Sequence, residues 1–459
     1  MSNRIKAFLT GRGYDLPSDD WYAQIEIFRQ WYVGYVKDFH HYEVFNGTAK
    51  RGVDRFRLNM AKTVCEDHAN LLLNEKVTIS TGEDDTWLND IFTANGFRTR
   101  ANQLIELAYA LGTGAFVEYL GKDKLPIIDY IRGDMIFPLS WDNGTITECA
   151  FGSVKKFSRE KKVYYVQLHY LDGGTYTIEN AVLDYDTGAP IKLPDGIEPK
   201  IDTKSTLPLF QIVTPNIVNN LDLDCPMGIS VFGNAIDEIK GCDLVFDSYM
   251  QEFNLGRKRI LFPMSMARIK MEQDGTMEPT FDTNDLLFGV FEDSSVDGKQ
   301  KIEEINMDIR SEQHEAGLTR VLDMLGQKCG LGPGRYKFEG GTVKTATEVI
   351  SEKSDLYQAM KKNEIPLGEA LEGLVRALAF LSGKAVDEVA IGFDDSIIQD
   401  SQSVQNDNIA QVGAGLKSKL KAIMEIQNLS EEDAQKELDR IDEENGVKEV
   451  DYGDGEGEI

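Results

Sequence analysis

The chain has 459 residues, of which 41% are hydrophobic, so it can bury a sizeable core and is too apolar for a disordered protein. Its 49 basic and 77 acidic side chains give a formal net charge of −28, which excludes a surface that is basic as a whole and grips nucleic-acid phosphates. No window approaches the roughly 20 uncharged apolar residues of a membrane span, and no apolar run follows Met1 as in a signal peptide. We therefore expect a soluble protein without a membrane partner, made in a cytoplasm and built from roughly two to four structural regions.

The cysteines are odd in number and far apart, and none forms a C-x-x-C pair: Cys65, Cys149, Cys225, Cys242 and Cys329. This spacing argues against a zinc ribbon or a dithiol redox site. We expect reduced thiols, most of them buried as small hydrophobic side chains.

The N-terminal part is predicted to be helical over residues 19–75. Its first apolar stripe has helical spacing: Trp21, Ile25, Phe28, Trp31, Tyr32 and Tyr35. Residues 58–73 repeat the pattern, and the alternation in residues 74–80 predicts a short strand. Residues 86–111 are predicted to form two further helices.

A β-rich region is expected from Ala115 to about Thr214. Its runs of β-branched and aromatic residues include residues 116–120, 163–168 and 176–178. Turn sequences such as Asp142-Asn-Gly144 and Asp172-Gly-Gly174 separate these runs. We therefore predict an antiparallel arrangement.

Two amphipathic helices follow, with short strands and turns between them in residues 260–307. The first helix is predicted at about residues 230–255, and its basic end, Arg257-Lys-Arg259, suits the helix dipole. It has an apolar stripe and a polar stripe, the polar one formed by Lys240, Asp243, Asp247, Gln251, Asn254 and Lys258. The second helix is predicted at residues 308–328.

A glycine-rich segment, Gly330 to Gly341, separates these helices from the C-terminal part. Thr345-Ala-Thr-Glu348 has the form of a capping box that opens a helix reaching Leu381, with a kink near Pro366. A short strand is expected at residues 388–393. From about residue 401 we predict a pair of helices, the second beginning near Ser430, and then a disordered acidic tail.

Motifs that carry chemistry are weak in this sequence. There is no G-x-x-x-x-G-K-[ST] loop, and Leu111-Gly-Thr-Gly-Ala115 lies between a helix and a strand, the wrong order for a dinucleotide site, so we interpret it as a tight turn. Gly228-Ile-Ser-Val-Phe-Gly233 is one residue too long for a nucleophile elbow and is interpreted as a helix start with Ser230 near the N-cap. We predict no catalytic residue, no metal site and no cofactor.

The histidines and acidic pairs are likewise interpreted as structural. The five histidines lack metal-ligand spacing and are expected to be hydrogen-bonded or exposed helix residues: His40, His41, His68, His169 and His314. Asp243 and Asp247 lie one turn apart on a predicted solvated or intersubunit face, where Lys240 would relieve their repulsion.

Basic residues gather in the first 60 residues and between Arg257 and Lys270. In the first region they are Arg4, Lys6, Arg12, Lys50, Arg51, Arg55 and Arg57. Both regions are predicted to meet phosphates or acidic partner surfaces, and neither shows a base-reading motif.

Taken in order, these segments resemble the portal proteins of long, non-contractile-tailed phages, of the kind best known from Bacillus phages. The resemblance spans nearly the whole chain and is carried by short motifs: Trp31-Tyr-Val-Gly34, Asn59-Met-Ala-Lys62, Leu71-Leu-Leu-Asn-Glu75, Gly228-Ile-Ser-Val-Phe-Gly233, Arg310-Ser-Glu-Gln-His-Glu315 and Lys344-Thr-Ala-Thr-Glu-Val349. Each motif is weak alone, and their order and spacing carry the specificity.

The resemblance implies an α+β portal-type fold with the following regions. A helical and β wing would comprise residues 1–229 and 345–400, and a two-helix stem residues 230–259 and 308–328. A small α/β clip would lie at 260–307, a tunnel loop at 329–344, a helical crown at 401–445 and the acidic tail at 446–459.

The resemblance also implies function and partners. The subunits would form a homo-oligomeric ring, commonly a dodecamer, at a capsid vertex of the virion, with double-stranded DNA passing through its channel without sequence specificity. Its partners would be the large terminase subunit, head-completion or adaptor proteins, and the major capsid and scaffolding proteins.

Two sets of residues are implied for these roles. The tunnel loop would contain Gly330, Gly332, Gly334, Lys337, Gly340, Gly341 and Lys344. Docking at the stem and clip would involve Lys240, Arg257, Lys258, Arg259, Arg268 and Lys270. The overall acidity fits a channel in which DNA slides without being trapped, because like charge removes deep phosphate-binding wells.

Two other interpretations remain open at this point. A different phage head or tail component, such as an adaptor or minor capsid protein, would lack the helix–β–helix order and would not form a ring alone. A cytosolic hydrolase with a carboxylate pair would need a pocket in which perturbed acids converge.

Overall fold

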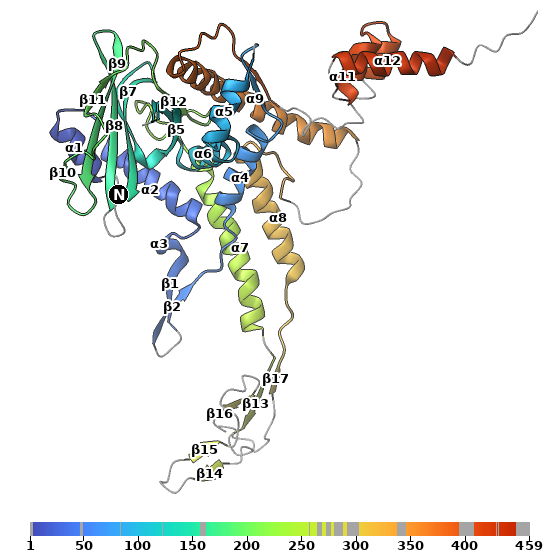
Figure 1. Ribbon diagram of the computed structural model, residues 1–459. Coiled ribbons are helices and arrows are strands. Elements are labelled where there is room, and N and C mark those ends of the chain that lie inside the picture. The colour runs from blue at the N-terminus through green and yellow to red at the C-terminus, as the bar shows by residue number, and fades with distance from the viewer. Residues whose placement is uncertain are drawn as a thin grey trace, which may run out of the picture. The chain divides into compact units, whose positions relative to one another are not determined.

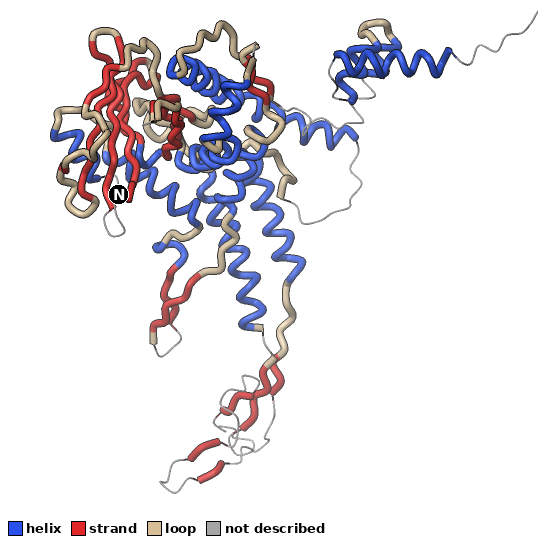
Figure 2. Tube along the Cα trace, viewed as in Figure 1, coloured by secondary structure: helices blue, strands red, loops and turns tan. Residues whose placement is uncertain are grey.

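The structure, a computed structural model, contains two compact units, Met1–Gly392 and Phe393–Ile459, which we describe separately (Figure 1). It describes residues 3–45, 49–82, 84–121, 123–156, 162–256, 258–263, 269–271, 277–279, 288–291, 303–336, 346–393, 408–427, 429 and 431–446. Helices and strands are both abundant, which confirms the α+β class (Figure 2).

The first unit begins with an N-terminal helical part. Its helices are α1 (Asn3–Gly11), α2 (Asp19–Val33), α4 (Met60–Leu72), α5 (Thr86–Ala94) and α6 (Phe97–Leu111). Trp21, Ile25, Phe28 and Trp31 on α2 are buried, as the apolar stripe predicted. The predicted second helix and the two helices in residues 86–111 are confirmed.

The segment between α2 and α4 is not helical, so the prediction of helix throughout residues 19–75 is wrong there. A single turn, α3 (Lys37–His40), leads into an antiparallel hairpin of β1 (His41–Phe45) and β2 (Lys50–Asp54). The local sequence explains this, because Tyr42, Val44 and Phe45 favour a strand and Asn46-Gly47 is a strong hairpin dipeptide.

The β-rich region is antiparallel throughout, as predicted. The larger sheet consists of β6 (Ile136–Asp142), β7 (Thr145–Lys156), β8 (Lys162–Asp172), β9 (Thr175–Asp184) and β10 (Pro190–Ile191). Its strand order is β10-β9-β8-β7-β6, and β11 (Lys200–Asp202) also pairs with β9. A second sheet has the order β12-β4-β5, with β4 (Gly114–Leu120), β5 (Pro126–Arg132) and β12 (Phe210–Val213). Asn143 and Gly144 both have positive φ, as a type I′ hairpin turn requires.

The end of α6 is joined tightly to the segment that precedes the first long amphipathic helix. Gly112 has φ +86°, and a Cβ there would lie 2.1 Å from the Gly228 carbonyl oxygen, so the predicted tight turn is confirmed. Buried Ser230 donates its hydroxyl to the Tyr109 carbonyl at 3.1 Å. Ser230 therefore satisfies an orphan carbonyl at the end of α6, and its predicted role near an N-cap is wrong.

The two amphipathic helices are α7 (Ile236–Leu255), which follows a 3-10 turn at Gly233–Ala235, and α8 (Ser311–Lys328). Between them lie β13 (Arg259–Pro263), β14 (Ile269–Met271), β15 (Met277–Pro279), β16 (Phe288–Phe291) and β17 (Glu303–Ile305). Strand β13 pairs in parallel with β16 and antiparallel with β17, while β14 and β15 pair with each other. The expected helix–strand–helix order is thus present, and the rest of the expected α/β module lies outside the described residues.

Helix α9 (Ala346–Leu381) begins where the capping sequence predicts and contains Pro366. Strand β18 (Ala390–Gly392) confirms the predicted strand and pairs antiparallel with β3 (Thr78–Ser80), so the C-terminal part of the unit joins the N-terminal helical part. In the second unit, α11 (Lys419–Gln427) and α12 (Glu431–Gly446) contact each other, as the predicted helix pair requires. The acidic tail beyond residue 446 lies outside the described residues.

We expect Gly112→Ala to lower the free energy of unfolding by about 3 kcal/mol or more, because the methyl group would meet a backbone oxygen and the residue needs a left-handed φ. The matched control is Gly173→Ala, which also has positive φ (+65°) but has nothing within 4 Å of the added methyl. It should cost only about 1 kcal/mol. Urea unfolding midpoints measure both, and equal losses would contradict the close packing of Gly112 against Gly228.

Candidate functional site: the α7–α8 pair

Helices α7 and α8 pack side by side in antiparallel directions (Figure 1). At one end Glu238 of α7 binds Lys328 of α8 at 2.7 Å. In the middle Gly241 lies so close to Val321 that an added Cβ would be 3.0 Å from its side chain. Glycine at this position allows the two helix backbones to approach, so the pair is packed along its length.

The opposite end of the pair is held by Glu252. Its carboxylate accepts hydrogen bonds from the backbone N–H of Arg310 at 2.8 Å and from the Arg310 guanidinium Nε at 2.6 Å. The ring Nε2 of His314 lies 3.1 Å from the same carboxylate. His314 and then Arg310 hold the pKa of Glu252 at about 2, so this carboxylate remains ionised across the physiological range.

Two carboxylates of the polar stripe of α7 are buried against the chain's own residues 55–58. Asp243 and Asp247 are only 2% and 4% exposed. Asp243 accepts the backbone N–H of Leu58 at 2.7 Å, and Asp247 accepts that of Phe56 at 3.0 Å. The expectation that these carboxylates form a solvated or intersubunit face is therefore wrong.

The spacing of the two elements explains this arrangement. Carboxylates four residues apart on a helix are separated by about 6 Å along its axis. Two N–H groups on the same side of an extended chain are separated by nearly the same distance, about 6.6 Å. The extended segment thus presents its free N–H groups in register with the acidic side chains of α7.

A buried histidine completes this cluster. His40 Nδ1 accepts the Val36 backbone N–H at 2.8 Å, so its Nε2 carries the proton and donates to Asp243 at 3.1 Å. Lys240, expected to relieve the repulsion of the two aspartates, instead pairs with Asp237 at 3.0 Å. The repulsion between the two aspartates is instead relieved by the backbone and imidazole N–H groups that donate to them. The Arg55 guanidinium, 3.7 Å from Asp247, contributes as well.

Several basic residues expected to meet phosphates or partners are bound within the chain. Arg55 donates to the Phe39 carbonyl at 2.9 Å, and Arg57 donates to the Gly34 carbonyl at 2.9 Å. Lys6 pairs with Asp19, Arg12 with Glu179 and Lys50 with Glu43. The N-terminal cations therefore serve mainly to join elements of the first unit.

The described docking residues implied for the end of the pair lie in the first strands after α7 or directly before them. Lys258 is exposed and forms an ion pair with Glu304 of β17. Arg259 is exposed at the start of β13, where its backbone lies opposite Ile305, and Lys270 lies in β14. Arg257 and Arg268 lie outside the described residues.

The first three glycines after α8 form a fastened turn. Gly330, Gly332 and Gly334 have φ of +76°, +77° and +86°, which only glycine adopts freely. The turn is held by hydrogen bonds from the Leu331 N–H to the Gly326 carbonyl and from the Gly334 N–H to Asp323. Lys337, Gly340, Gly341 and Lys344, the remaining residues of the expected tunnel loop, lie outside the described residues.

Helix α4 anchors the same turn from the other side. His68 Nε2 donates to the Cys329 carbonyl at 2.9 Å, and Arg335 pairs with Asp67 at 3.0 Å. Burial lowers the pKa of His68 to about 4, so the ring is neutral at physiological pH. The end of α8 is thus fixed to the N-terminal helices.

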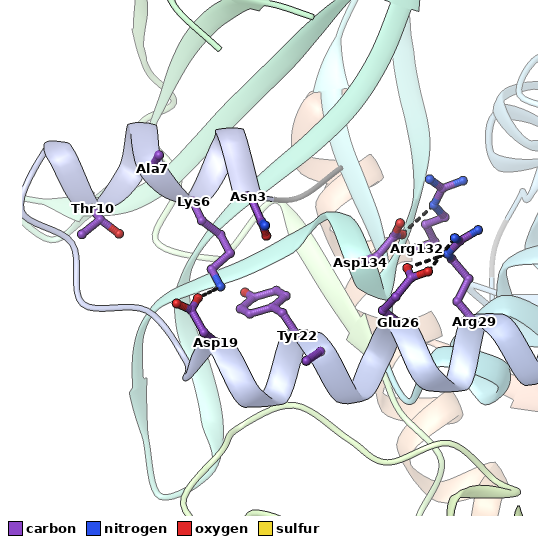
Figure 3. Close-up of a pocket in the computed structure, with 11 residues that line it drawn as sticks. Asn3, Lys6, Ala7, Thr10, Asp19, Tyr22, Glu26, Arg29, Arg132 and Asp134 are labelled. Atoms are coloured by element: carbon purple, nitrogen blue, oxygen red, sulfur yellow. Dashed lines mark hydrogen bonds and ion pairs between the residues drawn. The ribbon is translucent and has the colours of Figure 1, made fainter. Parts of the chain in front are cut away.

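A cleft of about 930 Å³ lies between α1 and α2 (Figure 3). Its charged side chains form three pairs across or along its walls: Lys6 with Asp19, Glu26 with Arg29, and Arg132 with Asp134. Tyr22 forms part of the wall and donates its hydroxyl to the Ile136 carbonyl at 3.0 Å. Every charged side chain that lines the cleft is therefore paired with an opposite charge, and the Lys6–Asp19 pair joins α1 to α2.

Within the described ranges, no group of three or more His, Cys, Asp or Glu side chains comes close enough to hold a metal ion. Across the same ranges, no helix has both the length and the apolar content that crossing a bilayer requires.

We expect Asp243→Ala to lower the free energy of unfolding by about 2 to 4 kcal/mol, because it leaves the His40 and Leu58 N–H groups buried without an acceptor. The matched control on the same helix is Asp237→Ala, whose side chain is 89% exposed, and it should cost at most about 1 kcal/mol. Urea unfolding followed by circular dichroism compares them. Equal effects would show that Asp243 is not a buried acceptor.

The buried His68 predicts a pH dependence of stability. Its folded pKa of about 4 lies below the ordinary value of 6.5, so between these values the unfolded chain binds a proton that the folded chain does not. Stability is therefore lost as the pH falls through this window. We expect His68→Gln to remove about 2 kcal/mol of the stability difference between pH 7 and pH 5. Parallel pH profiles for wild type and His68→Gln would contradict the neutral, buried imidazole.

Comparison with known proteins agrees with this arrangement. A search of curated proteins finds no match. The profile of one protein family, described as "Phage portal protein, SPP1 Gp6-like", matches residues 20–448, which include both helices of the α7–α8 pair and the strands between them. Because the match covers nearly all of the 459 residues, this chain belongs to the SPP1 Gp6-like family of phage portal proteins.

Proposed function

We propose that this portal protein forms a dodecameric ring whose channel passes double-stranded DNA during packaging and ejection. Its family is structural and non-enzymatic, belongs to the virion capsid, and implies an oligomeric ring with head partners such as terminase and capsid proteins. The family match over residues 20–448 is the observation that carries the proposal.

The proposed regions follow the order of elements along the chain. We assign the wing to residues 1–229 and 345–400, the stem to residues 230–259 and 308–328, and the clip to residues 260–307. The tunnel loop would be residues 329–344, beginning at the fastened turn that ends α8. The crown would be residues 401–445, followed by the acidic tail.

The α7–α8 pair supports the assignment of the stem. It is packed along its length and held by Glu238 at one end and by Glu252 at the other. Its strands follow at the end that Glu252 holds, since Arg259 begins β13 three residues after Gly256. A rigid helix pair that carries a small module of strands at one end suits the wall of a portal channel, because that end would be presented to the packaging motor.

The proposed partners of that far end are the large terminase subunit and, after packaging, the head-completion or adaptor proteins. The major capsid and scaffolding proteins would contact the wing from the capsid side. DNA would be contacted without sequence specificity, and the net charge of −28 supports low-friction passage because an excess of acidic side chains repels phosphates. Synthesis would take place in the cytoplasm of the bacterial host.

Light scattering and negative-stain images of the purified chain test the ring. The expected result is a particle of about twelve subunit masses with a central hole, as closed cyclic symmetry produces. A chain that stays monomeric even when it is produced together with the scaffolding and capsid proteins would contradict the proposal.

Charge reversal tests the docking residues. We expect Lys258→Glu with Arg259→Glu to reduce terminase-dependent packaging at least about tenfold while rings form normally, because two exposed cations of the proposed docking surface become acids. Lys192→Glu, at a side chain that is 92% exposed in the wing, is the matched control and should package normally.

A charge swap separates docking from local folding. Lys258→Glu combined with Glu304→Lys keeps an ion pair between residue 258, directly before β13, and residue 304 of β17, but exchanges the two charges. If packaging returns to normal in this variant, Lys258 serves the strand module alone and the docking assignment is wrong for it.

A further inference from the structure

The β1–β2 hairpin, here called the arm (residues 41–45 and 49–54), has no hydrophobic core of its own. Its residues are exposed apart from Tyr42 and Val53, which lie opposite each other across the strands. An isolated two-stranded hairpin is marginally stable in water. Yet Val44 and Phe45 near its tip are 42% and 66% exposed, which is apolar surface that a second element would normally cover.

The base of the arm, in contrast, is fixed. The Arg55 N–H donates to the His40 carbonyl at 2.8 Å, and His41 lies 2.9 Å from Asp54 across the strands. Just beyond the arm, the backbone N–H groups of Phe56 and Leu58 donate hydrogen bonds to the buried aspartates of α7. The subunit therefore holds the arm in a defined direction before any partner arrives, which lowers the entropy lost on docking.

A groove of about 280 Å³ lies beside α7 and α8. Its walls are mainly apolar, with Leu58, Val245, Phe246, Tyr249 and Leu318 as the apolar residues. An enclosed apolar cavity of about 150 Å³ can take up benzene, so this groove has room for a phenyl ring. Exposed Glu315 lies at the groove, and the described residues include no ion-pair partner for it.

The arm and the groove are complementary in both chemistry and charge. Arg51 lies opposite Val44 across the strands and Lys50 lies opposite Phe45, so two cations flank the apolar tip. Lys50 is paired with Glu43, whereas Arg51 has no acidic partner among the described residues. An apolar tip beside the basic Arg51 thus matches an apolar groove beside the acidic Glu315.

The arm does not fill the groove of its own subunit. Leu58, which lines the groove, is fixed at the base of the arm, and the tip lies about 14 Å further along the strands. Figure 1 shows the hairpin and α8 on opposite sides of α7. The occupant that the arm fits is therefore a second copy of this chain.

We propose that the arm of each subunit docks on its neighbour, with Phe45 in the α7–α8 groove and Arg51 beside Glu315. Each subunit has one arm and one groove, which differ from each other, so the contact is head-to-tail and repeats around a closed ring. The proposal rests on the ring proposed above and adds the residues that join adjacent subunits.

The test is cross-linking between differently tagged chains that each carry one added cysteine. In both chains the half-buried Cys225 is replaced by serine, and the other native cysteines are buried. One tagged chain carries Phe45→Cys, and the other carries Leu318→Cys, so any cross-link between the new thiols must join two subunits. Mixed rings are treated with a short thiol cross-linker and separated under denaturing conditions. We expect a mixed dimer band in the 45–318 combination.

The matched control replaces Leu318→Cys with Leu223→Cys, on a loop outside the groove where the side chain is 79% exposed. This combination should give at least tenfold less cross-linked dimer. If rings are seen in images but the 45–318 yield does not exceed the control, the arm contact is wrong and the ring remains. If no rings form under any condition, the ring itself is wrong, and the arm contact with it.

Charge reversal gives an independent readout. Arg51→Glu should raise the protein concentration needed for half-assembly about tenfold, which corresponds to about 1.4 kcal/mol, and Arg51→Glu combined with Glu315→Arg should restore it. Failure of the double variant to recover assembly, with both single variants folded by circular dichroism, would overturn the pairing of Arg51 with Glu315.

Discussion

The contact between two buried carboxylates of α7 and the backbone of residues 55–58 organises this protein. Asp243 and Asp247 are buried and therefore need donors, because an ionised carboxylate without hydrogen bonds is costly inside a protein. The donors come from a segment nearly 200 residues earlier in the chain, together with His40. This one contact joins the N-terminal helices to α7, and it also sets the direction in which the β1–β2 hairpin leaves the subunit.

The α7–α8 pair is fixed at both ends by different chemistry. Near the helical core, His68 and Arg335 fasten the turn after α8, and at the far end Glu252 closes the pair against Arg310. A helix pair held this way transmits force as a unit, because its ends cannot slide without breaking several hydrogen bonds.

The charges of this portal protein divide into two roles. Many cations form ion pairs within the subunit, as in the cleft between α1 and α2, where each of the three cations that line the cleft has an acidic partner. The acidic excess remains for the surface and yields the net charge of −28. A chain with this balance can assemble through a few local cations such as Arg51 or Lys258 without becoming a general DNA-binding surface.

The sequence by itself determined the elements whose signal is local. Helical spacing predicted α2, α4 and α7, the capping sequence predicted where α9 begins, and turn sequences predicted the antiparallel β region. The order of these elements, with its short motifs, also identified the portal family. The hairpin at residues 41–54 carried a local signal as well, in its strand-forming residues and Asn46-Gly47, but the strong helical spacing on either side obscured it.

Only the tertiary structure decided what the polar residues do. Sequence spacing placed Asp243 and Asp247 on one face of a helix, and it could not reveal that free N–H groups from residues 56 and 58 would meet them there. Ser230 is likewise a residue type that often caps helices, yet its hydroxyl donates a hydrogen bond to the Tyr109 carbonyl of α6. Hydrogen-bond partners distant in sequence depend on how elements pack, because a polar side chain satisfies whichever donor or acceptor the fold brings within about 3 Å.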